Sequence, residues 1–140
     1  MTKATVFAND VLDHILQNGA SGTFVFGGTT YTLPVRLIFM STVSVAATQG
    51  TEWATAAGYT QGGVSLAGLL ATVASAGSKA NTGAVTVTNA PAGTWADNEI
   101  KDSTGTPKRM IFRGGASLAK TVNLGDTCTI ATSNLTATET

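Results

Sequence analysis

The segment AVTVT at residues 84–88 decides the fold class, because it alternates strictly between apolar and hydroxyl side chains. Alternation with period two is typical of a strand whose two faces meet different surroundings. We therefore expect Val85 and Val87 to point inward and the threonines to point outward. The next five residues, NAPAG at 89–93, have the composition of a turn. This part of the chain thus predicts a short strand followed by a reversal.

Similar β-type segments recur at intervals of roughly ten residues, with Gly, Pro and Asn between them, and this spacing favours a β-sandwich or barrel. Residues 19–33 predict an arm or short hairpin that turns at Gly27 and Gly28. Residues 64–74 fit a strand or a helix equally well. The other predicted strands are 35–40, 84–88, 95–101, 109–113, 120–122, 127–130 and 135–138.

The N-terminal segment is the one clear amphipathic helix, because apolar residues recur there at a spacing of four. Thr5 is the expected N-cap and Gly19 the expected residue closing the helix. The apolar stripe consists of Phe7, Ala8, Val11, Leu12, Ile15 and Leu16, and the opposite side of Asn9, Asp10, Asp13, His14 and Gln17.

Charge is scarce: 11 % of the 140 residues are charged and the formal net charge is zero, whereas an average soluble domain carries about 25 %. A surface covered by neutral hydroxyls costs less to dehydrate than one covered by ions, and its copies repel one another little. The chain has no basic stripe for nucleic acid and no apolar run of membrane-helix length. A single cysteine, Cys128, indicates a chain that needs no disulfide bridge.

Candidate chemistry is sparse, so we predict a protein that is not an enzyme, with no catalytic residue, no metal and no cofactor. His14 is the only imidazole and is expected to be a solvated residue of the helix. Cys128 is expected to be a small residue of a strand. Asp97, Glu99 and Asp102 form the only acidic cluster, and whether they bind a cation is left open.

Aromatic residues offer two alternatives. Trp53, Tyr59 and Trp95 could stack on a carbohydrate, but closing the ends of a small β core is the favoured interpretation. Phe24, Phe26 and Tyr31 lie in a Gly- and Thr-rich stretch, where aromatic side chains either fold back onto the core or insert into a partner.

The order of several segments resembles a family of small virion structural proteins of tailed double-stranded DNA bacteriophages, described as head decoration (cement), minor capsid or tail-fibre-like proteins. The helix segment NDVLDHIL at 9–16 is similar to the family pattern N-x-L-L-D-H-x-L. The most similar part is the C-terminal end, KTVNLGDT at 120–127 followed by NLTAT at 134–138. The resemblance also includes residues 37–42, 50–52, 58–59, 81–87 and 94–95.

The chain departs from the family pattern in two places. The strand after Trp95 is polar at 97–102, where the family is apolar, so we expect this strand to be an edge or to face a partner. Many members also lack the insertion at 24–31, which makes this arm the most specific feature of the chain.

The resemblance implies a mainly β chain: a single compact, jelly-roll-like β-sandwich over 1–140 with one N-terminal α-helix. Residues 1–34 would form the helix and arm, and 35–140 the β core. It further implies a capsid decoration protein that is made in the bacterial cytoplasm and binds the major capsid protein on the outer capsid lattice. The oligomer that the resemblance implies is a homotrimer. The alternative is a tail-tip or tail-fibre component that binds the host surface. We predict the partner contacts to be Thr2, Lys3, Val6, Phe7, Phe24, Phe26 and Tyr31.

Overall fold

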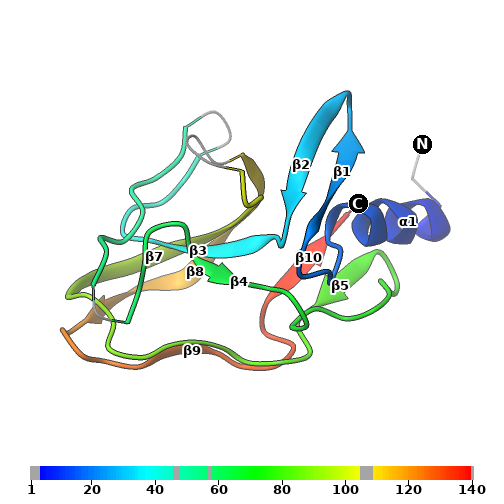
Figure 1. Cartoon of the computed structure of the whole chain (residues 1–140). Coiled ribbons are helices and arrows are strands. Elements are labelled where there is room, and N and C mark those ends of the chain that lie inside the picture. The colour runs from blue at the N-terminus through cyan, green and yellow to red at the C-terminus, as the bar shows by residue number, and fades with distance from the viewer. Residues whose placement is uncertain (1–3, 46–47, 57, 105–108, 140) are drawn as a thin grey trace. The chain divides into compact units, whose positions relative to one another are not determined.

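The computed structural model describes residues 4–45, 48–56, 58–104 and 109–139, and in them the chain is mainly β with one N-terminal helix, as predicted (Figure 1). The chain forms two compact units. Unit 1 comprises Met1–Val35, Leu66–Val85 and Ile130–Thr140, and unit 2 comprises Arg36–Ser65 and Thr86–Thr129. The predicted division into a helix and arm over 1–34 and a β core over 35–140 stays a prediction. A single sandwich with jelly-roll order stays a prediction.

Unit 2 contains an antiparallel sheet in which β3 (Arg36–Met40) and β7 (Gly93–Lys101) are the inner strands. The outer strands are β4 (Val64–Ser65) and β8 (Met110–Val122). β3 forms because it is a continuous run of large apolar residues after Arg36, and four of its five side chains are buried. The strands predicted at 109–113 and 120–122 are parts of the single strand β8. Strand β8 continues through Gly114 and Gly115, although glycine disfavours a strand, because these residues pair with β7. The register of this pairing shifts at two places, as at a β-bulge.

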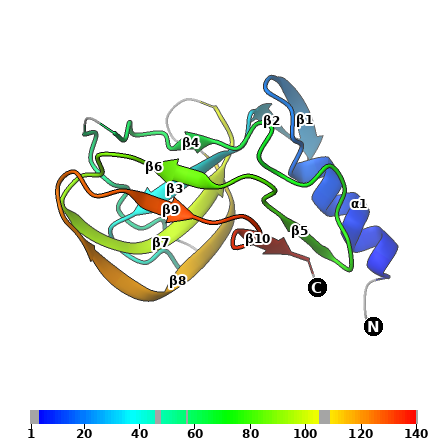
Figure 2. The same ribbon diagram turned by 90° about the horizontal axis from the view of Figure 1, so that it is seen from below.

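Unit 1 contains helix α1 (Thr5–Ile15) and the predicted hairpin of β1 (Gly22–Phe26) and β2 (Thr29–Leu33). The hairpin turn needs glycine, because Gly27 and Gly28 have φ angles of 57° and 75°. Strands β5 (Ser78–Ala80) and β10 (Thr136–Thr138) pair antiparallel in the same unit, and Figure 2 shows α1 running beside β5.

The segment from residue 64 to residue 80 contains one strand that the sequence did not predict and one stretch that it left open between strand and helix. Strand β5 was missed because Ser, Lys and Ala are poor strand formers, and its pairing with β10 decides its conformation. The ambiguous residues 64–74 contain the two-residue strand β4 followed by turns, and no helix.

Helix α1 lies where it was predicted, but its cap and its buried face differ. The N-cap is Ala4, which makes no side-chain hydrogen bond, and Thr5 is the first helical residue. The helix ends at Ile15 with Leu16 as C-cap, before Gly19. Phe7, which the periodicity placed on the apolar stripe, is exposed. The buried residues of the stripe are Ala8, Leu12, Ile15 and Leu16.

The alternating segment at 84–88 forms β6 (Val85–Val87), which lies beside β9 (Cys128–Ile130) where the chain passes between the units (Figure 2). Val85 and Val87 are buried and Thr86 is exposed, so the predicted alternation is confirmed. The Thr86 hydroxyl lies 3.2 Å from the Thr129 hydroxyl on the exposed side of the two strands.

Candidate interaction surface

The acidic cluster of unit 2 is internal, because its residues project from the inner strand β7. Asp97, Glu99 and Lys101 alternate onto one face of this strand and are all buried. The expectation that 97–102 forms a sheet edge or faces a partner is therefore wrong. Pairing with β3 on one side and β8 on the other places the polar strand in the middle of the sheet.

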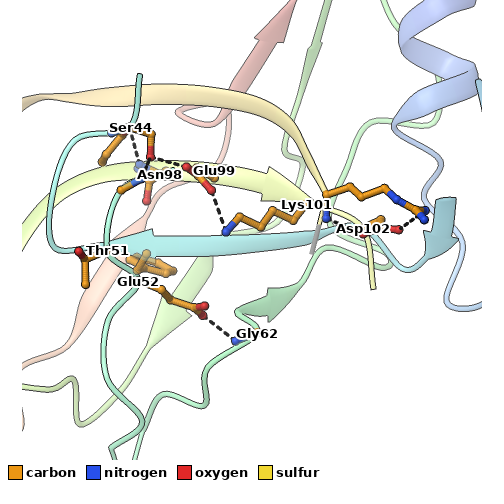
Figure 3. A network of polar contacts seen from close by, with 12 residues as sticks. Ser44, Thr51, Glu52, Gly62, Asn98, Glu99, Lys101 and Asp102 are labelled. Carbon is orange, nitrogen blue, oxygen red and sulfur yellow. Dashed lines mark hydrogen bonds and ion pairs between the residues drawn. The ribbon is translucent and has the colours of Figure 1, made fainter. Parts of the chain in front are cut away.

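The two buried carboxylates of this face have protein partners, and Figure 3 shows Glu99 between Ser44 and Lys101. Asp97 accepts hydrogen bonds from the backbone N–H groups of Ser44 (2.9 Å) and Asn98 (2.7 Å). Glu99 accepts a hydrogen bond from the Ser44 hydroxyl, and its other oxygen lies 2.9 Å from Nζ of Lys101. These contacts offset the cost of burying charged groups, and Glu99 Oε2 is balanced by its ion pair with Lys101 without a hydrogen bond to the residues that the structure describes.

Asp102 continues this internal arrangement at the end of β7. It accepts hydrogen bonds from the Arg109 backbone N–H (3.1 Å) and from the Thr104 hydroxyl. Its carboxylate also lies 3.8 Å from the Arg109 guanidinium. Within the part of the chain that the structure describes, no group of three His, Cys, Asp or Glu side chains could hold a metal ion.

Trp53 and Tyr59 are core residues, as the favoured interpretation predicted. Both are buried and pack with Phe39, at ring centroid distances of 5.1 Å and 5.9 Å. Trp95 is partly exposed, and its ring centroid lies 5.2 Å from that of Phe39. The carbohydrate-stacking alternative is wrong as stated, because two of its three rings have no free face.

Tyr59 also fixes its neighbours through its hydroxyl. This group donates to Glu52 Oε1 at 2.8 Å and accepts a hydrogen bond from the Phe39 backbone N–H at 3.2 Å. Burial, followed by the charge of the Glu52 carboxylate, raises the pKa of Tyr59 far above its ordinary value.

His14 and Cys128 are placed as expected. His14 is exposed, and its Nε2 donates to the Val25 carbonyl oxygen at 2.9 Å. Cys128 is a buried residue of β9, and burial raises the pKa of its thiol. The hydrogen bond of His14 and the burial of Cys128 are typical of residues that stabilise a fold.

The predicted partner contacts divide into exposed and packed residues. Val6 and Phe7 are 70 % and 55 % exposed at the start of α1, and Phe26 is 46 % exposed beside the hairpin turn. Phe24 is buried and stacks on Tyr31, with ring centroids 5.0 Å apart. Thr2 and Lys3 lie outside the described residues.

Sequence reasoning missed Val25, which is 57 % exposed next to Phe26. The period-two pattern of the hairpin could have found it, because Phe24 and Val25 must point to opposite faces of β1. Val25 and Phe26 thus leave two large apolar side chains uncovered beside one turn.

Polar side chains explain why α1 leaves Val6 and Phe7 outside. Asn9 accepts a hydrogen bond from the Gly77 N–H at 2.8 Å. Asp13 accepts one from the Ala74 N–H at 2.8 Å and lies 2.7 Å from Nζ of Lys79. Since the polar side of the helix docks on this backbone, the helix is rotated away from the orientation that its apolar stripe alone would favour.

No family model, curated protein or solved structure matches the chain. Among the described residues, no helix has the length and apolar character needed to span a membrane.

Proposed function

We propose that the chain is a bacteriophage structural protein, a capsid decoration protein that binds the outer capsid lattice and stabilises the head. The observation that carries this proposal is that exposed apolar side chains occur on a chain with few charged residues. Val6, Phe7, Val25 and Phe26 leave large apolar side chains in water on a small chain of zero net charge. The resemblance in segment order to virion proteins supports the same class.

The proposed mechanism is a clamp between neighbouring subunits of the shell. A stable contact buries about 800 Å² on each partner, which is within reach of a chain of this size. Aromatic side chains such as Phe7 and Phe26 are the residue type that dominates such contacts. Several weak contacts made at once by an oligomer, a trimer in the resembling family, then add in free energy.

A binding experiment with the wild-type chain tests the proposal. The purified protein is mixed with expanded capsids that lack decoration, and with unexpanded shells as the control, and both are sedimented. We expect saturable binding to the expanded capsids and immunogold labelling over the heads of intact particles. Absence of the protein from the capsid pellet, or label confined to the tail, would overturn the assignment.

The tail-tip alternative receives no support from the aromatic residues. Its proposed sugar platform consisted of Trp53, Tyr59 and Trp95, and the first two are buried in the core of unit 2. The labelling experiment above distinguishes the two locations directly.

A further inference from the structure

The connection between α1 and β1 contains the only Asn–Gly pair in the sequence, Asn18 and Gly19. An asparagine followed by glycine is especially prone to deamidation, because glycine has no side chain to hinder attack by its own backbone nitrogen. Helix α1 has its C-cap at Leu16 and β1 begins at Gly22, so the pair lies outside regular structure. Both residues are half-buried, so water can reach them.

The backbone at position 19 does not itself require glycine. The φ angle of Gly19 lies outside the left-handed region that favours glycine. A Cβ atom at this position would lie 3.4 Å from Leu33 Cδ1 and 3.6 Å from the Ser21 carbonyl oxygen, which are ordinary van der Waals contacts. The fold therefore accepts alanine at position 19, so Gly19→Ala changes the reactivity of Asn18 without straining the chain.

The polar contacts of the pair favour attack by the Gly19 nitrogen on the Asn18 side chain. Asn18 Oδ1 accepts a hydrogen bond from the Leu70 N–H at 3.1 Å, and the Asn18 main-chain carbonyl accepts one from the Gly68 N–H at 3.2 Å. Among the residues that the structure describes, no group accepts a hydrogen bond from the Gly19 N–H. The side-chain carbonyl is thus polarised by a fixed donor, and the Gly19 nitrogen can lose its proton without breaking a hydrogen bond to the described part of the chain.

We propose that Asn18 is a site of spontaneous deamidation in the folded chain, and that the Leu70 N–H assists the reaction. The Gly19 nitrogen gives its proton to water and forms a bond to Asn18 Cγ, which closes a succinimide ring. Negative charge develops on Oδ1, where the Leu70 N–H stabilises it. The bond from Cγ to Nδ2 then breaks, and the leaving group takes a proton from water and departs as ammonia. Water opens the succinimide at either carbonyl and yields aspartate or isoaspartate, so no oxidant or second substrate is needed.

The two products differ in their effect on the contacts of residue 18. Aspartate keeps an oxygen that accepts the Leu70 N–H, and it adds one negative charge to a chain whose formal net charge is zero. Isoaspartate carries the main chain through the former side chain, which lengthens the backbone by one methylene group at a residue that is hydrogen-bonded to Gly68 and Leu70. We therefore expect isoaspartate to lower the melting temperature of the chain more than aspartate does.

Peptide mass mapping of aged protein tests the inference. The purified chain is incubated at mildly alkaline pH in the folded state and, in parallel, unfolded in guanidinium chloride. We expect the exchange of NH₂ for OH at Asn18, with aspartate and isoaspartate both present, at a rate in the folded chain at least equal to that in the unfolded chain. Because the fold holds the Leu70 N–H against Oδ1, slower conversion in the folded chain would overturn the inference.

Two controls locate the reaction at this pair. Gly19→Ala, shown to be folded by circular dichroism, should slow conversion of Asn18 by about tenfold, equivalent to a barrier about 1.4 kcal/mol higher, and an unchanged rate would contradict attack by the nitrogen of residue 19. Asn123 is the internal control, because its side chain is exposed but Leu124 follows it. Conversion of Asn123 as fast as that of Asn18 would mean that exposure alone decides, and would overturn the inference. The capsid experiment uses fresh, unconverted protein, so its outcome is independent of this one.

Discussion

The two units solve the problem of buried polar groups in different ways. In unit 1, single side chains satisfy the backbone of irregular segments: Asn81 donates to the Gly83 and Ala131 carbonyl oxygens and accepts a hydrogen bond from the Leu135 N–H. In unit 2, the sheet satisfies its own backbone, and charged side chains such as Glu99 and Lys101 satisfy one another.

The difference between the units lies in which buried polar groups are charged and which are neutral. Unit 2 buries the Glu99–Lys101 ion pair on the single strand β7, and a buried pair is costly to break because it leaves a charge without a partner. Unit 1 also buries a charge, Lys79, which pairs with Asp13, but its irregular segments are held by the neutral amide of Asn81, whose loss leaves unsatisfied backbone groups of lower cost. We therefore expect a substitution that leaves a buried charge without a partner to destabilise the protein more than one that leaves neutral backbone groups without hydrogen bonds.

The largest expected effect comes from removing one member of the buried ion pair. Lys101→Met should lower the free energy of unfolding by about 3–5 kcal/mol, because it leaves the Glu99 carboxylate buried without its cation. Denaturant unfolding measures the change. The double variant Glu99→Gln with Lys101→Met should recover most of the loss, and a double variant as unstable as the single one would contradict the charge-pairing explanation.

The matching change in unit 1 should cost less. Asn81→Ala removes three side-chain hydrogen bonds at a buried position and should lower the free energy of unfolding by about 2–3 kcal/mol. Asn123→Ala is the control, since its amide is exposed and bonds only weakly to Asp126, at 3.4 Å. If Asn81→Ala proved more damaging than Lys101→Met, the ranking of the two units would be reversed.

Tyr59 should make the free energy of unfolding decrease at alkaline pH. The folded-state pKa of Tyr59 lies above the ordinary value of about 10, so stability is fully present below pH 10 and falls as the pH rises above it, where only the unfolded chain ionises. Tyr59→Phe should remove this part of the pH dependence and cost about 1 kcal/mol at neutral pH through its lost hydrogen bonds. Urea unfolding of both proteins across the alkaline range measures the difference, and identical pH profiles would count against the assignment.

The smallest effect is expected on the exposed threonine pair of β6 and β9. Thr86→Val and Thr129→Val remove a 3.2 Å contact between hydroxyl groups that water can replace, so each should change stability by less than about 0.5 kcal/mol. Thermal unfolding measures this change. A loss as large as that of Asn81→Ala would mean that these hydroxyls are not solvated in the way that their exposure indicates.

The sequence predicted the elements whose pattern is local. The strand at 84–88, the Gly27–Gly28 hairpin and the N-terminal helix all follow from periodicity and turn chemistry, and all three are confirmed. It also favoured the core placement of Trp53 and Tyr59. Its error at 97–102 has a simple origin, because a polar strand reads as exposed unless the pairing of its charges is known.

The candidate surface was only partly predictable for the same reason. The apolar stripe of α1 includes Phe7, but the hydrogen bonds of Asn9 and Asp13 to distant backbone groups turn this residue outward. Val25 was overlooked although the alternation of β1 places it opposite Phe24. Burial of Phe24 depends on its stacking with Tyr31 across the hairpin and on the His14 ring of the helix.

By itself, the sequence determined the mainly β class, the helix position and the neutral surface, because propensity, periodicity and composition act over a few residues. Only the tertiary structure decided which polar residues are internal and which apolar ones are exposed. Asp97, Glu99 and Lys101 are buried because strands from distant parts of the chain flank them, and Val6 and Phe7 are exposed because polar contacts dock the helix. Those contacts join residues more than fifty positions apart, such as Asn9 and Gly77, and no local pattern contains them.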